Sequence, residues 1–215
     1  MPLVRSMQIA ERVSRPSTFF FLAILLLAGC TSLQRCAYEG FGRDEWQKPA
    51  EVIQALNLKP GSRVADLGSG SGYFTLRLAD AVGPTGKVYA VDIDAGLNEQ
   101  VAKRARERGY KNIEVILAKV DDPLLPPSGV DMIFTTNVYH HIHDRVSYFA
   151  RAKKHLKPSG RLAIIDFNSK QWFDAFGGHF TPDSVIKKEM GEAGYKLERE
   201  YSFLPRQYFL VFALK

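Results

Sequence analysis

The segment Val64–Tyr73, VADLGSGSGY, decides the fold of this chain. A short apolar run ends in three glycines at alternate positions, Gly68, Gly70 and Gly72, and a helical apolar pattern begins at once. Glycines let the backbone turn tightly and let a ligand approach it without meeting a Cβ atom. The start of a helix offers unpaired N–H groups to a polar or anionic group. A strand, a glycine turn and a helix in this order predict a nucleotide-binding α/β unit.

The rest of the chain continues the alternation of strand and helix on both sides of this segment. Apolar periodicity predicts helices over 44–57, 73–81, 95–108, 144–156 and 181–193. It predicts strands over 63–67, 87–92, 113–117, 131–135 and 161–167, with a terminal antiparallel pair over 195–203 and 207–213. Asp44 is expected to cap the first helix, and Thr181 the last one, with Pro182 at its first helical position.

Two acids near the glycine segment indicate which nucleotide-like ligand it takes. A dinucleotide loop would carry a third glycine where this chain has Tyr73. Asp66, two residues before the first glycine, disfavours a pyrophosphate but suits the ammonium group of a methionine moiety. Asp92 ends the next strand, where an acid can accept both ribose hydroxyls. Asp94 is an alternative partner for the ribose.

These motifs resemble those of class I S-adenosylmethionine (SAM)-dependent methyltransferases, particularly the ubiquinone/menaquinone-biosynthesis type. Asp-x-Gly-x-Gly-x-Gly after an apolar strand is similar to their first motif, and LKPSGRL at 156–162 is similar to their turn into the fifth strand. The resemblance implies a Rossmann-like fold, with helices on both faces of a mostly parallel seven-stranded sheet whose last strand is antiparallel. It implies SAM as cofactor, held by Asp66, Gly68, Ser69, Gly70, Gly72, Tyr73, Asp92, Ile93, Val120 and Asn137.

The chain departs from the family pattern after its third strand. Relatives often have Gly-Asp-Ala there, and the Asp contacts adenine, whereas this chain has Lys119 and Val120. The Val120 backbone N–H is expected to serve instead. No Asn-Pro-Pro-Tyr motif follows the fourth strand, which argues against methylation of nucleobases or glutamine amides. The acceptor is therefore expected to be a small or lipid-like molecule.

The candidate catalytic residues follow the fourth strand, where ligands bind outside the carboxyl ends of parallel strands. Three of the five histidines lie in the segment NVYHHIHD at 137–144. His140 or His141 could act as a general base, if the acceptor must lose a proton, or could serve only in packing. Asp166, at the end of the fifth strand, could orient a base. The spacing gives no clear metal site.

Composition and charge narrow the possible partners. The chain has 215 residues, 46% of them apolar and 24% charged, with 29 Lys and Arg against 23 Asp and Glu. The net charge of +6 is spread without a dense basic run, so no nucleic-acid partner is predicted. The two cysteines, Cys30 and Cys36, cannot form a disulfide scaffold.

The N-terminal segment predicts a targeting signal and not a part of the domain. A basic stretch precedes the apolar run FFFLAILLLA at 19–28, which is too short for a membrane-spanning helix but suits a secretory signal. Leu27-Ala28-Gly29-Cys30 resembles the lipobox of bacterial lipoproteins. The resemblance implies lipidation at Cys30 and a membrane-anchored lipoprotein on the periplasmic side of the cell envelope, with the outer membrane favoured because Thr31 follows the cysteine.

Three segments are thus predicted: a signal peptide at 1–29, a tether at 30–43 and a methyltransferase domain at 44–215. The residues before the first helix, Trp46 among them, could fold over the cofactor as a lid, or Trp46 could simply pack the helix end. The aromatic segment 168–180 is expected to line the acceptor pocket. The alternative to an enzyme is a non-catalytic lipoprotein that binds a nucleoside-like ligand, because SAM is made in the cytosol and the targeting signal points outside it. A nicotinamide oxidoreductase is disfavoured by Asp66 and Tyr73.

Overall fold

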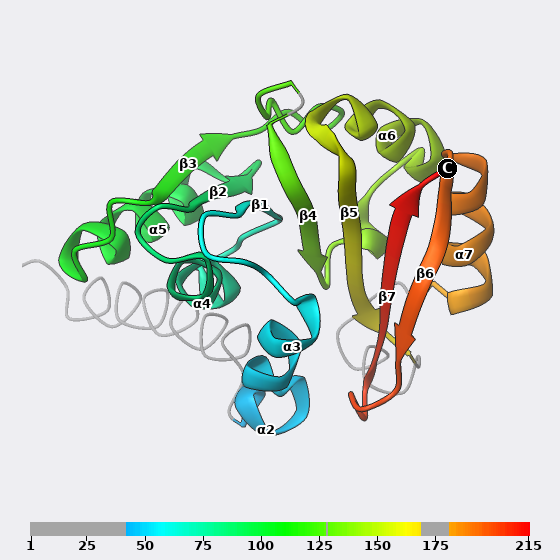
Figure 1. Cartoon of the computed structure of the whole chain (residues 1–215), viewed down its shortest axis with the longest axis horizontal. Helices are drawn as coiled ribbons and strands as arrows, with labels where there is room; N and C mark the ends of the chain where they lie inside the picture. The colour runs from blue at the N-terminus through cyan, green and yellow to red at the C-terminus, as the bar shows by residue number, and fades with distance from the viewer. Residues whose placement is uncertain (1–41, 128, 169–180) are drawn as a thin grey trace, which may run out of the picture. The chain divides into compact units, whose positions relative to one another are not determined.

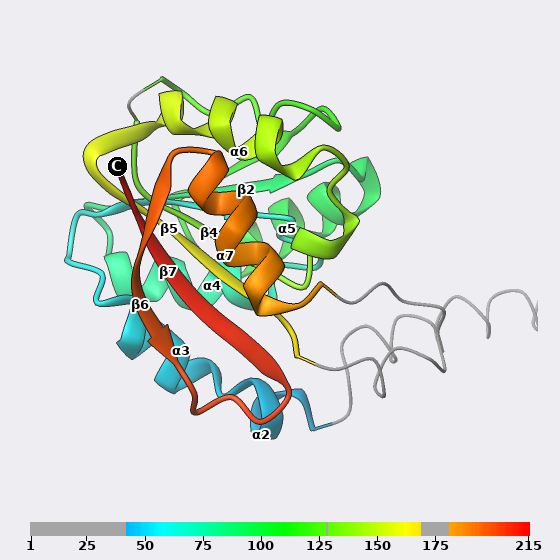
Figure 2. The ribbon, with the colours of Figure 1, turned by 90° about the vertical axis from the view of Figure 1, so that its right-hand side faces the viewer.

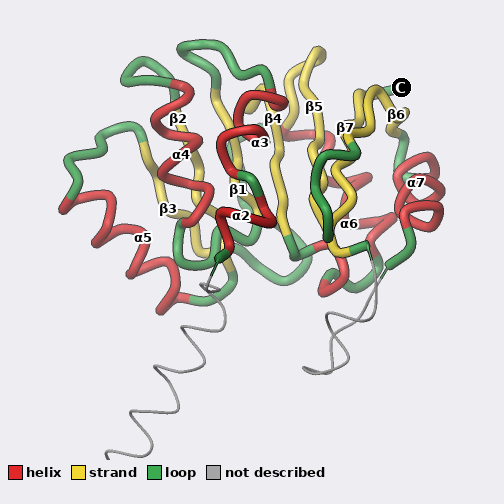
Figure 3. The backbone as a smooth tube through the Cα atoms, turned by 90° about the horizontal axis from the view of Figure 1, so that it is seen from below, coloured by secondary structure: helices red, strands yellow, loops and turns green. Residues whose placement is uncertain are grey.

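A central sheet organises the chain in the computed structural model, which describes residues 42–127, 129–168 and 181–215. Its seven strands lie in the order β3-β2-β1-β4-β5-β7-β6, which can be followed across Figure 3. The strands are β1 (Arg63–Leu67), β2 (Lys87–Asp92), β3 (Ile113–Leu117), β4 (Val130–Thr136), β5 (Leu156–Phe167), β6 (Tyr195–Tyr201) and β7 (Gln207–Leu214). The first five pair in parallel, and β7 runs antiparallel to both of its neighbours. The predicted Rossmann-like sheet with an antiparallel last strand is confirmed.

Burial explains which strands occupy the middle of the sheet. β1, β2 and β4 are buried along nearly their whole length, as expected for parallel strands covered on both faces. β6, with the sequence YKLEREY, is exposed at most positions and lies at the edge. Charged side chains on an edge strand discourage pairing with another chain.

Helices cover the two faces of the sheet and separate the core into two parts. On one face, α3 (Pro49–Leu56) and α4 (Tyr73–Val82) pack on strand residues such as Val64 and Phe134. On the other face, α6 (Arg145–Ala152) and α7 (Asp183–Glu192) pack on residues such as Ile164 and Leu210. Figure 2 shows these two pairs of helices on opposite sides of the sheet. The helix α5 (Ala95–Glu107) packs against β2 and β3 (Figure 1).

The first predicted helix is wrong in two respects. Instead of one helix over 44–57, the structure has α2 (Arg43–Gln47) and α3, separated by Lys48, whose φ is 43°. Pro49 causes the break, because its ring disfavours helical geometry in the residue before it and it lacks an N–H group for the helix. Asp44 lies in the first turn of α2, and Gly42 is the N-cap residue.

The later elements differ from prediction at their ends. Helix α6 stops at Ala152 and continues as the short 3-10 helix η2 (Lys153–His155), while β5 begins at Leu156 because that residue already pairs with Val130. The last helix begins at Asp183, so Pro182 is the N-cap and not the first helical residue, and Thr181 precedes it. Helix α7 still ends one residue before Ala193.

The described chain from Gly42 onward forms one compact unit. The predicted signal peptide and most of the tether lie in residues 1–41, outside the described residues, and so does the greater part of the aromatic segment at 168–180. Within the described ranges, no helix combines the length and the apolar character needed to cross a membrane.

Candidate active site

The glycine loop between β1 and α4 has the backbone that its sequence demands. Gly68, Gly70 and Gly72 have φ values of 73°, 54° and 87°, in the left-handed region that favours glycine. A Cβ on Gly68 would lie 2.2 Å from a methyl carbon of Val138, so the loop packs tightly against the segment after β4. A Cβ on Gly70 would meet nothing within 4 Å. The loop is thus packed on one side and leaves Gly70 open to an approaching ligand.

Asp66 occupies the end of β1 beneath this loop. Its side chain is 1% exposed, and the Thr75 hydroxyl donates a hydrogen bond to Oδ2 at 2.6 Å. Oδ1 is buried and accepts no hydrogen bond from any residue in the described ranges. Burial raises the pKa of Asp66 from 3.8 to about 7, against the opposing effects of the Thr75 hydrogen bond and the nearby charge of Arg43. A buried carboxylate with a vacant oxygen suits a cationic ligand group.

The two acids after β2 have different roles in the structure. Asp92 accepts hydrogen bonds from the backbone N–H groups of Gly70, at 2.9 Å, and Asp94, at 3.0 Å. Asp94 caps α5, because its Oδ1 accepts from the N–H groups of Gly96 and Leu97 at 2.7 and 3.1 Å. Since capping occupies Asp94 and Asp92 contacts the glycine loop, the geometry favours Asp92 as the ligand-binding acid.

Exposed apolar side chains follow the carboxyl ends of β2 and β3. Ile93 is 61% exposed and Val120 is 69% exposed, and Leu117, which pairs with Asp92, is 54% exposed. Exposed apolar side chains that lie together can form a surface for an apolar ligand. Their place beside Asp92 suits the flat faces of a purine ring.

His140 and Asp166 form a buried pair beside this edge of the sheet. His140 lies on the 3-10 helix η1 (Tyr139–His141), directly after β4, and Asp166 lies near the end of β5. Nδ1 of His140 is 2.7 Å from Oδ1 of Asp166, and the backbone N–H of His140 donates to Oδ2 at 3.0 Å. The carboxylate therefore fixes both the ring and the backbone of His140. His141 is exposed, with its ring centroid 4.0 Å from that of His140.

A buried polar network connects α2 with the ends of β4 and β7. The Gln47 side chain is fully buried and donates to Thr136 Oγ1 at 3.0 Å and to Gln207 Oε1 at 3.2 Å. Gln207 in turn donates to the Asn137 side chain at 2.6 Å. Asn137 has φ 58°, and its N–H donates to Ile165 O at 2.9 Å. The network places α2 at the edge of the sheet that carries the glycine loop.

Aromatic and charged side chains of α2 and α4 complete this edge. Tyr73 lies between two guanidinium groups, with Arg43 3.8 Å and Arg77 4.2 Å from its ring centroid. Its hydroxyl donates to Asp44, which also pairs with Arg77 at 3.3 Å. Burial and the Asp44 contact raise the pKa of Tyr73, so it stays protonated. These contacts join α2 to α4 beside the glycine loop.

Trp46 faces β5 from the same helix. Its ring centroid is 6.0 Å from that of Phe167, and the Arg206 guanidinium lies 5.7 Å from the Trp46 ring. The Phe167 ring is also 6.2 Å from the His140 ring. Trp46 therefore packs against the end of β5, and Phe167 lies next to both Trp46 and the buried His140.

Sequence reasoning missed the side chains that support the predicted site. Thr75, Gln47 and Gln207 have no motif signal, since each contacts a residue distant in sequence. Only the apolar neighbours of Gln207, at the start of an apolar strand, indicate burial at that position. Among the described residues, no group of three His, Cys, Asp or Glu side chains could hold a metal ion.

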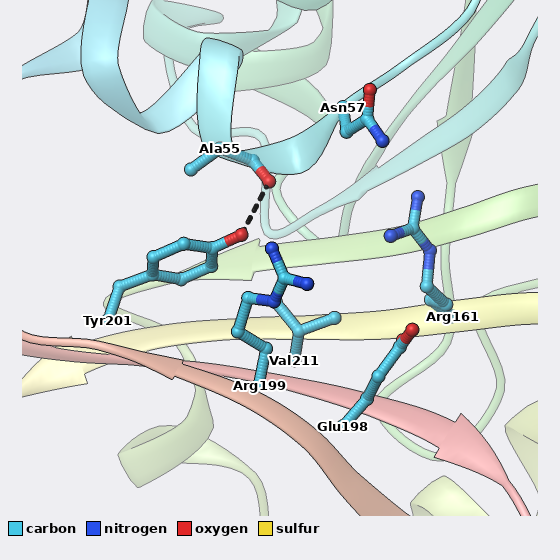
Figure 4. A pocket seen from close by; sticks show the side chains of 7 residues that line it. All are labelled: Ala55, Asn57, Arg161, Glu198, Arg199, Tyr201 and Val211. Atoms are coloured by element: carbon cyan, nitrogen blue, oxygen red, sulfur yellow. Dashed lines mark hydrogen bonds between the residues drawn. The ribbon is translucent and has the colours of Figure 1, made fainter.

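A separate hollow lies between α3 and the strands β5 and β6 (Figure 4). Tyr201 donates its hydroxyl to Ala55 O at 2.9 Å, and Arg161 donates to Leu56 O at 3.2 Å. Both interactions satisfy carbonyl groups in the last turn of α3, which lack partners within the helix. Arg161 is in register with Met132, toward the amino ends of the parallel strands. This hollow is therefore a helix-end contact, remote from the glycine loop.

Known proteins resemble the chain in sequence. A family model described as "Methyltransferase domain" matches residues 58–200. The ubiquinone/menaquinone biosynthesis C-methyltransferase UbiE of Erwinia tasmaniensis is 26% identical over 156 residues, 68% of this chain and 62% of the relative. A 2-phytyl-1,4-naphtoquinone methyltransferase of Trichormus variabilis is 31% identical over 159 residues, 73% of this chain and 68% of the relative. An uncharacterized 37.1 kDa protein in a Streptomyces fradiae transposon is 30% identical, and the chain spans 44% of its length.

Solved structures show the same fold. A SAM-dependent methyltransferase from Aquifex aeolicus has a TM-score of 0.73 and 25% identity, over 83% of this chain and 96% of the other. The magnesium protoporphyrin IX methyltransferase of Synechocystis, crystallised with S-adenosylhomocysteine (SAH), has a TM-score of 0.65 over 80% of this chain and 83% of the other, at 17% identity.

Proposed function

Because the chain belongs to the class I SAM-dependent methyltransferase family, we propose that it transfers a methyl group from SAM to a small-molecule or lipid-like acceptor. The observation that carries the proposal is Asp66, a buried carboxylate with a vacant oxygen beneath an open glycine loop. SAM supplies an activated methyl group when bound. The residues of this chain bind and orient the donor and the acceptor, which is where much of the rate of an in-line transfer originates.

The described residues fit the donor group by group. Asp66 is suited to the α-ammonium, the backbone around Gly70 to the methionine chain, and Asp92 to the ribose hydroxyls. Ile93 and Val120 offer apolar surface to the adenine. We propose the remaining predicted ligands as further contacts of the donor: Gly68, Ser69, Gly72, Tyr73 and Asn137. Their support is that Gly68 to Tyr73 form one loop, and that Gly68 packs against Val138, the residue after Asn137.

His140 is proposed as the general base, in preference to His141. Asp166 holds Nδ1 of His140, so the acceptor proton would be taken on Nε2 while the carboxylate stabilises the resulting imidazolium. The buried carboxylate also favours one orientation of the ring. His141 is exposed, which suits a role at the rim of the site.

The acceptor class is proposed to be a planar, hydroxylated ring. Two observations support it: the aromatic pair of Trp46 and Phe167 beside His140, and the quinone-related substrates named for two of the relatives. An aromatic side chain favours a flat apolar ligand that stacks on it. A ring hydroxyl or the carbon beside it carries a proton that His140 could accept.

Turnover on a library of methyl acceptors tests the activity directly. With tritiated SAM, the wild-type protein is expected to label ring acceptors, and His140→Ala is expected to lower the rate about 10²- to 10⁴-fold at unchanged SAH affinity. His141→Ala is the matched comparison, with a smaller expected loss. SAH binding without turnover on any acceptor would instead favour the alternative, a non-catalytic lipoprotein that binds a nucleoside-like ligand.

The location is proposed from the sequence alone. Lipidation of Cys30 would anchor the domain to the periplasmic face of an envelope membrane, with the outer membrane favoured and no membrane-spanning helix needed. Labelling cells with a clickable fatty acid should mark the wild-type protein and Cys36→Ser, whereas Cys30→Ser should stay unlabelled and unprocessed. An unlabelled wild-type protein in the soluble fraction would contradict the lipoprotein signal. Such a protein would have direct access to SAM in the cytosol.

A further inference from the structure

Arg43 is a charged side chain at the glycine loop that no sequence motif indicated. It is the first residue of α2, and its guanidinium covers the Tyr73 ring at 3.8 Å. Tyr73 directly follows Gly72, so this contact places Arg43 over the end of the loop. Arg43 also lies near enough to the Asp66 carboxylate to lower its pKa. A cation and an anion thus lie together beneath and beside one loop.

The position of Arg43 is fixed from the opposite end of its short helix. Its Nε donates to the Gln47 side chain, and Gln47 is fully buried against Thr136 and Gln207 at 3.0 and 3.2 Å. Within the described ranges only Nε of Arg43 takes part in a hydrogen bond, which leaves the two terminal nitrogens for a ligand. Burial lowers the pKa of Arg43, because its charge is partly removed from water. A partly desolvated guanidinium gains most from an anionic partner.

Arg77 stacks on the same ring but has a different environment. Its terminal nitrogens donate to Tyr73 O at 2.7 Å and to Asp44 at 3.3 Å. Its charge is therefore already balanced by Asp44 at the surface. Of the two arginines on Tyr73, only Arg43 combines proximity to Asp66 with unused donors.

We propose that Arg43 binds the α-carboxylate of the methionine moiety while Asp66 binds its α-ammonium. In an α-amino acid both charged groups are attached to one carbon, so a recognition site needs an anion and a cation close together. Arg43 and Asp66 meet this requirement, and Tyr73 with Gln47 holds the guanidinium in place. The α2 helix is then part of the donor site and not merely a cover over it. This inference rests on the proposed function, because it assigns a ligand group of the same donor.

A ligand pair separates this role from a merely structural one. SAH and 5′-deoxy-5′-(3-aminopropylthio)adenosine differ only in the α-carboxylate. We expect wild-type protein to bind SAH about 10- to 100-fold more tightly than the aminopropyl analogue. Arg43→Gln should lose that factor for SAH and bind the analogue as the wild type does. Arg43→Lys should recover part of the SAH affinity, and Arg77→Gln should preserve the preference for SAH.

Isothermal titration calorimetry on the purified protein, with circular dichroism to confirm folding, gives all of these affinities. Equal losses for SAH and the analogue in Arg43→Gln would overturn the proposal, since they would indicate general damage to the loop. Unchanged SAH affinity in Arg43→Gln would overturn it as well, while leaving the proposed function intact. Failure of the wild-type protein to bind either ligand would refute the proposed function and this inference together.

Discussion

Replacing Asp66 with Asn should remove a pH-dependent cost that the buried carboxylate imposes on the fold. Asp66 is 1% exposed, and burial raises its pKa from 3.8 to about 7. Between these two values the folded protein retains a proton that the unfolded chain has released. Rising pH therefore lowers the free energy of unfolding through this window, and the full loss, about 4 kcal/mol, is reached above pH 7.

A comparison of the free energy of unfolding at pH 5 and pH 8.5 isolates the cost of ionising Asp66. From pH 5 to pH 8.5, ionisation of Asp66 should cost the wild-type protein about 3 kcal/mol of stability. Asp66→Asn cannot ionise there, so its free energy of unfolding should fall less than that of the wild type by this amount. The absolute stability of the variant depends also on how its amide pairs with Thr75, but the difference between the two pH values does not.

Urea denaturation followed by tryptophan fluorescence at both pH values measures the quantity. Asp121→Asn, which removes an exposed carboxylate, is the control and should change with pH as the wild type does. Parallel changes for the wild type and Asp66→Asn would refute the reasoning, because Asp66 would then have the same pKa in the folded and unfolded chains.

Three further predictions concern donor binding, and a fourth concerns the stability of the glycine loop. An ammonium group beside Asp66 requires the ionised carboxylate, so the Kd for SAH should rise about tenfold from pH 8 to pH 6. Calorimetry in buffers of different ionisation enthalpy should then show that binding releases a proton. A Kd that does not change with pH would show that binding does not depend on this proton. Asp92→Ala should weaken SAH binding by about 1–3 kcal/mol by leaving ligand hydroxyls unpaired, and an equal loss in Asp94→Ala at full helix content would identify the wrong acid. Gly70→Val should abolish SAH binding while the protein stays folded, because its side chain would enter open space above the loop. Retained SAH affinity in this variant would exclude the loop as the site. Gly68→Ala should instead lower the free energy of unfolding by at least about 1 kcal/mol, as measured by thermal melting.

The sequence by itself determined the order of the elements and the place of the site. The consecutive apolar residues at 88–91 in β2 and 132–134 in β4 predict a buried parallel sheet, because such strands are covered on both faces. The left-handed residues at Gly68 and Gly70 are local requirements of a tight turn, so the glycine pattern predicts them without tertiary information. The break between α2 and α3 is equally local, because Pro49 disfavours helical geometry in the residue before it.

Only the tertiary structure decided which side chains meet at that site. The sequence favours Asp92 over Asp94 as the ribose-binding acid, and the structure adds that Asp94 caps α5 whereas Asp92 contacts the glycine loop. His140 and His141 are adjacent, and only the placement of β5 beside β4 gives one of them a buried carboxylate. Arg43 reaches the glycine loop because Gln47 is buried against two distant strands. Contacts between residues far apart in sequence leave no periodicity or motif, since each partner is selected by the packed fold and not by its neighbours in the chain.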